Sequence, residues 1–110
     1  MSLTVAGSNN DVAEVLDMMG RVEAPNWSDL YKVYEIIEHT GTLSSAMNAA
    51  AVSENRMSLF RRTANHEKAS GPDARHSRSK QDPPKNPMTI EEARRLISAL
   101  IQTWVESLQP

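Results

Sequence analysis

The stretch TIEEARRLISALIQTWVESL, residues 89–108, decides the fold class. Its apolar residues recur at spacings of three and four, which is the period of one face of an α-helix. Thr89 and Glu92 form a T-x-x-E capping box that predicts where this helix begins. A face of about half the circumference is apolar: Ile90, Ala93, Leu96, Ile97, Leu100, Ile101, Trp104, Val105 and Leu108. So wide a face predicts either the central helix of a bundle or a surface on which two copies associate.

A second amphipathic helix is predicted over residues 27–40, where Asn26 is a suitable N-cap and Gly41 a suitable left-handed stop. A short helix should span residues 11–20 with Asp11 as its cap, and two helices joined by a tight turn should cover residues 42–65. No segment shows the alternation of a β-strand. We therefore expect an all-α protein, a compact bundle of four to five helices with helices 27–40 and 89–108 at its core.

Length and composition limit the classes of protein. The chain has 110 residues, of which 39% are hydrophobic and 24% charged, which suits a single globular domain. We expect a flexible N-terminus over residues 1–10 and one helical domain over residues 11–110. The chain has no cysteine, which excludes disulfides, zinc–thiolate sites and thiol nucleophiles. Without a signal peptide or membrane span, the sequence predicts a cytoplasmic protein with no membrane partner.

Charge is distributed unevenly along the chain. Residues 1–54 carry two basic and eight acidic side chains, whereas residues 61–80, RRTANHEKASGPDARHSRSK, hold six of the twelve Lys and Arg residues. Regular structure should stop from His66 to Met88, because Gly71, Pro72 and the later prolines interrupt any helix, so we expect one long ordered basic loop laid across the bundle. The loop would either bind an anionic partner or pair with the acidic half of the chain.

The two helices predicted within residues 42–65 match a helix-turn-helix pattern. Five residues fall where that motif buries side chains: Ala46, Ala50, Val52, Met57 and Phe60. Ser53 would start the recognition helix, which would expose to a DNA groove Glu54, Asn55, Arg56, Ser58 and Arg61. Two positions depart from the pattern: Met47 stands where the helices cross and alanine or glycine is usual, and Ala51 stands at the turn glycine.

Arg61 and His66 have the spacing of the Arg and His that line the site of HEPN ribonucleases. This resemblance implies a general base beside a cation that stabilises a phosphorane. The polar amide often found directly after that arginine is absent, since Arg62 follows Arg61. We expect no metal site from His66, Asp73 and His76, because the two histidines lie across a Gly-Pro turn without the spacing of a helical ligand pair and the sequence offers no fourth ligand. We also expect no cofactor.

The segments LYKVYEIIE, SGPDARHSR and NPMTIEEARRLI are similar to a family of small bacterial proteins, over roughly residues 26–108. The resemblance implies a bacterial origin and one compact domain. It carries over no active residue.

These observations favour a non-catalytic interaction module with no catalytic residue of its own. Its partner would be nucleic acid or another anionic molecule, with a HEPN-like ribonuclease as the alternative and a homodimer through helix 89–108 as a further expectation. The predicted binding surface comprises Arg56, Arg61, Arg62, His66, Arg75, His76 and Arg78.

Overall fold

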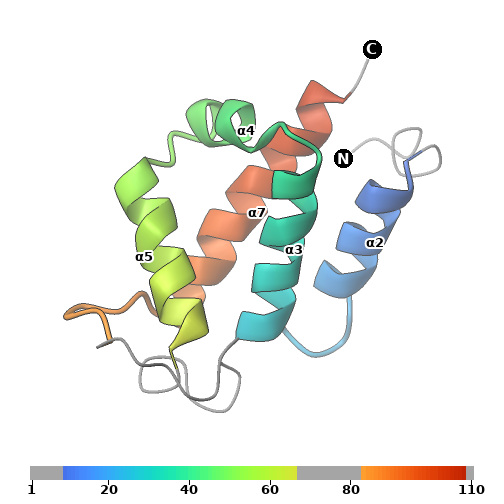
Figure 1. Cartoon of the computed structure of the whole chain (residues 1–110). Coiled ribbons are helices and arrows are strands. Elements are labelled where there is room, and N and C mark those ends of the chain that lie inside the picture. The colour runs from blue at the N-terminus through green and yellow to red at the C-terminus, as the bar shows by residue number, and fades with distance from the viewer. Residues whose placement is uncertain (1–8, 67–82, 109–110) are drawn as a thin grey trace.

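The computed structural model describes residues 9–66 and 83–108. These residues form five helices and no β-strand, which confirms the expected all-α bundle (Figure 1). The helices are α2 (Asn10–Met19), α3 (Trp27–His39), α4 (Leu43–Ala49), α5 (Glu54–Asn65) and α7 (Ile90–Ser107). Most of the predicted basic loop and of the predicted flexible N-terminus lies outside the described residues.

Helix α7 is the central helix of the bundle, which is one of the two arrangements that its wide apolar face predicts. It packs against α3 and α4, and α3 lies between it and α2 (Figure 1). Its buried residues are Ala93, Leu96, Ile97, Leu100, Ile101, Trp104 and Val105. The Thr103 hydroxyl lies 3.0 Å from the carbonyl oxygen of Ala46, which fastens α4 to α7. The apolar face is thus covered within the chain.

Capping boxes set the starts of both core helices. The Asn26 side chain accepts from the Asp29 N–H, and the Asp29 carboxylate accepts from the Asn26 N–H. Thr89 and Glu92 form the same reciprocal pair at the start of α7, as predicted. Gly41 follows α3 with a φ of 81°, the left-handed conformation expected of it.

Helix α2 differs in detail from the prediction. Its N-cap is Asn9 rather than Asp11, because the Asn9 side chain accepts from the N–H groups of Asp11 and Val12. Its buried residues are Val12, Val15 and Met18, and Leu16 and Met19 lie at the edge of the core. Helix α2 occupies the side of α3 away from α5 (Figure 1).

Residues 83–89 lead into α7 without regular structure. The Met88 side chain is buried, and its N–H donates to the buried Thr63 hydroxyl at 3.1 Å, which joins this segment to α5. Across residues 9–66 and 83–108, no helix combines the length and the apolar character required to cross a membrane.

Candidate nucleic-acid interface

The turn between α4 and α5 is closed by main-chain hydrogen bonds. The Val52 N–H donates to the Met47 carbonyl at 2.9 Å, and the Ala51 N–H donates to the Asn48 carbonyl at 3.2 Å. This pair of bonds defines a Schellman motif, whose residue after the C-cap is left-handed. Ala51 occupies that position with a φ of 58°. Alanine therefore takes here the conformation that usually calls for glycine.

The helices on either side of this turn bury side chains at the positions where a helix-turn-helix buries them. Ala46, Met57 and Phe60 are at most 3% exposed, and Ala50 and Val52 are partly buried against the core. Met47, at the crossing position, is 8% exposed and belongs to the same core cluster. The larger side chain is accommodated as part of the core.

The inner face of α5 packs on α3 through an aromatic cluster. The Phe60 ring lies 6.2 Å from that of Trp27, 6.1 Å from that of Tyr31 and 5.9 Å from that of Tyr34, measured between centroids. Tilted and stacked pairs at these separations are favourable beyond the area they bury. The cluster fixes the inner face of α5 on α3, so the opposite face of α5 is turned to solvent.

The outer face of α5 presents polar side chains to solvent, from Glu54 in its first turn to Arg62 in its last. Ser53 caps the helix by accepting from the Arg56 N–H at 3.1 Å. Glu54, Asn55 and Arg62 are exposed, and Ser58 is half-buried. The Asn55 and Arg62 side chains have no hydrogen bond or ion pair to any residue in the described part of the chain. These two side chains remain available to a partner.

Arg61 is committed to contacts within the fold. Its guanidinium donates to the Glu54 carboxylate at 2.8 Å and to the Tyr34 hydroxyl at 3.1 Å, and it lies 5.8 Å from the centre of the Tyr34 ring. The Tyr34 hydroxyl in turn donates to Glu38 at 2.8 Å. A continuous chain of polar contacts therefore joins the first residue of α5 to the last turn of α3.

The chain of contacts also changes the acidity of its members. Burial, followed by the hydrogen bond to Glu38, raises the pKa of Tyr34 to about 12. The hydrogen bond to Glu54 is the largest cause that raises the pKa of Arg61, which stays charged. The Tyr34 hydroxyl is therefore a neutral donor over the whole physiological range of pH.

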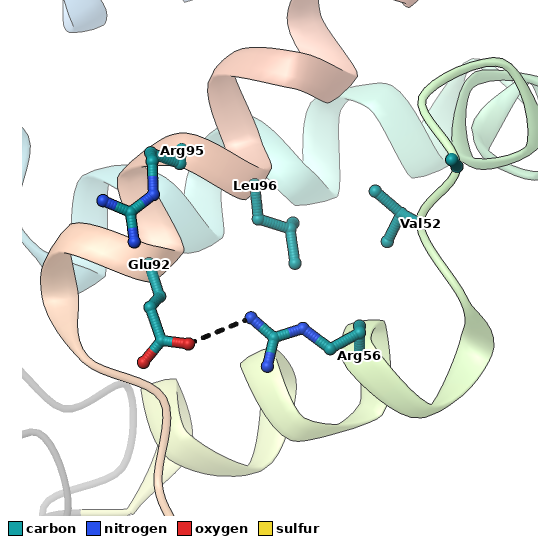
Figure 2. Close-up of a pocket in the computed structure, with 6 residues that line it drawn as sticks. Val52, Arg56, Glu92, Arg95 and Leu96 are labelled. Atoms are coloured by element: carbon teal, nitrogen blue, oxygen red, sulfur yellow. Dashed lines mark hydrogen bonds and ion pairs between the residues drawn. The ribbon is translucent and has the colours of Figure 1, made fainter.

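A shallow groove of about 280 Å³ separates the start of α5 from the start of α7. Figure 2 shows Arg56 reaching from α5 to Glu92 on α7, with Arg95 beside Glu92. The Arg56 guanidinium lies 3.2 Å from the Glu92 carboxylate. Hydrogen bonds from Thr89, and then the one from Arg56, lower the pKa of Glu92. Arg56 thus ties α5 to the capping box of α7.

The predicted binding residues have different environments. Arg62 is exposed, Arg56 and Arg61 are ion-paired within the chain, and His66 is only 4% exposed. Arg75, His76 and Arg78 lie outside the described residues. No group of three His, Asp or Glu side chains that could hold a metal ion occurs among residues 9–66 and 83–108.

Sequence reasoning missed the roles of Tyr34 and Arg95. The Tyr34 ring is buried in the core, and its hydroxyl also anchors Arg61 at a distance of 27 residues along the chain. Arg95 lies next to the buried Leu96 on α7, and only the packing of α5 against α7 reveals that both line the groove. Nothing local in the sequence signals either contact.

Comparison with known proteins gives no match: no protein-family model, no curated protein and no solved structure is significantly similar to the chain. The resemblances drawn from short segments of the sequence therefore stay predictions.

Proposed function

We propose that α4 and α5 form a helix-turn-helix that binds double-stranded DNA without catalysis, with α5 as the recognition helix. The observation that carries this proposal is the left-handed Ala51 within a turn of two main-chain hydrogen bonds. Such a turn directs the second helix across the first, so that its start projects from the domain. Burial of Met57 and Phe60 on the inner face of α5 supports the same orientation.

Three exposed residues have side chains suited to DNA. The Asn55 amide is suited to bonding adenine, and the Arg62 guanidinium, which pairs with no described residue, is suited to phosphate. Glu54, the third of these residues, stands at the first position of α5. Because phosphate contacts supply most of the affinity of such proteins, Arg62 should dominate binding to DNA of arbitrary sequence.

Duplex DNA fits this surface better than duplex RNA. The major groove of B-DNA is about 12 Å wide and admits an α-helix. The major groove of an RNA duplex is deep and too narrow for side chains to read. No aromatic side chain is exposed on α5, whose one ring, Phe60, is fully buried, so stacking of unpaired bases gains no support from this helix.

The test is fluorescence anisotropy with a labelled random-sequence duplex of about 20 base pairs, roughly two helical turns. The full chain should bind at low salt, with an affinity that falls as salt is raised. Arg62→Ala should weaken binding and reduce the slope against log salt by about one. Arg21→Ala is the matched control, because Arg21 is an exposed arginine that pairs with Asp17 on α2.

The proposal fails if the full chain does not bind duplex DNA at low salt, or if Arg21→Ala and Arg62→Ala weaken binding equally. Stronger binding to duplex RNA than to duplex DNA would also contradict it. Cleavage of RNA by the wild-type chain, lost in His66→Ala, would instead favour the ribonuclease alternative. That alternative is not preferred here because His66 is buried and Arg61 is engaged by Glu54 and Tyr34.

The proposed function agrees with the expected cytoplasmic location and bacterial origin, since DNA is accessible in the bacterial cytoplasm. A homodimer would suit DNA with two half-sites, but the apolar face of α7 that suggested it is covered by the chain itself. Light scattering checks the prediction: a mass of about twice 12.2 kDa would support a dimer.

A further inference from the structure

Glu54 is an unexpected residue at the start of a helix proposed to enter a DNA groove. It is the first residue of α5, and its side chain is 72% exposed. A carboxylate near phosphates is repelled unless something offsets its charge. The Arg61 guanidinium, 2.8 Å away, supplies that offset.

The same contact also fixes where the carboxylate points. Arg61 holds one oxygen, Oε1, while the Tyr34 hydroxyl holds Arg61 from α3. Glu54 also lies in the first turn of α5, where the positive end of the helix dipole attracts a negative charge. The other oxygen of Glu54, Oε2, accepts no hydrogen bond from any residue that the structure describes. An oriented acceptor is thus left free at the exposed start of α5.

Base edges in the major groove differ in what they offer to such an acceptor. Cytosine presents its N4 amino group, a donor, with no acceptor of its own in that groove. Adenine presents a donor but also the acceptor N7, while guanine and thymine present acceptors that would repel a carboxylate. A fixed carboxylate therefore discriminates in favour of cytosine.

We infer that Glu54 is a specificity-determining residue that accepts a hydrogen bond from the N4 amino group of a cytosine, and that Arg61 is its positioning residue. This inference rests on the proposed DNA-binding function. Arg61 acts by orienting and partly neutralising Glu54, and Tyr34 acts by holding Arg61.

The experiment is repeated selection of duplexes with a randomised centre by the full-length wild-type chain and its variants, followed by sequencing. The wild type should enrich a site with one C·G pair preferred by about five- to tenfold. Glu54→Ala should lose the preference at that pair alone, while its affinity for random duplexes rises because a negative charge is gone. Glu54→Gln should change the preferred base from cytosine to adenine, since an amide pairs with the N6 and N7 of adenine.

Variants of Arg61 test the positioning role. Arg61→Ala should relax selection at the same pair as Glu54→Ala but should lower the affinity for random duplexes, so the two substitutions act alike on specificity and oppositely on affinity. Loss of folding alone cannot produce that pattern. Tyr34→Phe keeps the ring and removes only the hydroxyl, so it should weaken the preference for the same base pair less than Arg61→Ala does. If Arg61→Ala does not fold, Tyr34→Phe alone tests the positioning role of Arg61. Arg62→Ala should weaken binding without changing the selected site.

The outcomes separate the two proposals. No binding of random duplexes by the wild type refutes DNA binding itself. Binding without enrichment of any site, or enrichment of the same site by Glu54→Ala, refutes the role of Glu54 and leaves DNA binding intact. Retention of the C·G preference in both Arg61→Ala and Tyr34→Phe refutes the positioning role of Arg61.

Discussion

Replacing Ala51 by glycine should stabilise the protein. A residue with a Cβ atom pays about 1–2 kcal/mol in the left-handed conformation, in which Ala51 is held with a φ of 58°. Glycine removes that cost. Its greater conformational freedom in the unfolded chain, however, lowers the free energy of unfolding by about 0.4–1 kcal/mol. Ala51 is exposed, so its methyl group contributes little burial. The net expectation is a free energy of unfolding higher by about 1 kcal/mol and a Tm higher by about 4 °C.

Urea unfolding followed by tryptophan fluorescence measures this change, since the Trp104 ring is fully buried. The midpoint should rise while the dependence on urea stays constant, because the exposed area on unfolding is unchanged. Ala13→Gly is the matched control. Ala13 is exposed inside α2 in a right-handed conformation, so glycine there should destabilise by about 0.5–1 kcal/mol. Equal destabilisation by both substitutions would refute the left-handed turn and, with it, the main support for the helix-turn-helix.

Three further predictions concern the core and its caps. In Tyr31→Phe, which leaves Tyr34 as the one tyrosine, the phenolate absorbance should titrate with a midpoint of about 12 rather than 10.0. Because folding raises the pKa of Tyr34, its neutral hydroxyl contributes fully to the free energy of unfolding below pH 10, and this contribution is lost as the pH rises towards 12. A titration midpoint near 10 would contradict the raised pKa. Phe60→Ala should lower the free energy of unfolding, measured by urea unfolding, by about 3–5 kcal/mol. A loss below about 1 kcal/mol would show that Phe60 does not pack in the aromatic cluster. Thr89→Ala should cost about 1 kcal/mol in thermal unfolding by removing the cap of α7, whereas Thr89→Ser should cost little.

The helices could be predicted because their signals are local. Capping residues such as Thr89 and Asn26 act on N–H groups within three residues, and periodicity reports which face is apolar. The boundary of α2 was wrong by two residues at its cap, because Asn9 and Asp11 are both good N-caps and the sequence alone does not rank them.

The candidate site was predicted only in part because its electrostatics depend on packing. Periodicity placed Arg56 and Arg61 on the outside of α5, but it carries no information on which carboxylate lies opposite each. Arg56 meets Glu92 across 36 residues, and Arg61 meets Tyr34 across 27. Two of the charges assigned to a binding surface thus serve, in the fold, to hold α5 in place.

The placement of α2 has a consequence for how the molecule turns in an electric field. Helix α2, on the side of α3 away from α5, carries three acidic side chains and no basic one, whereas α5 carries three arginines against one glutamate (Figure 1). The described part of the chain therefore has an electric dipole moment with its negative end at α2. Near a polyanion this dipole experiences a torque that rotates α2 outwards and α5 inwards before any contact forms. Added salt, by shortening the range of that torque, should slow association more than it speeds dissociation.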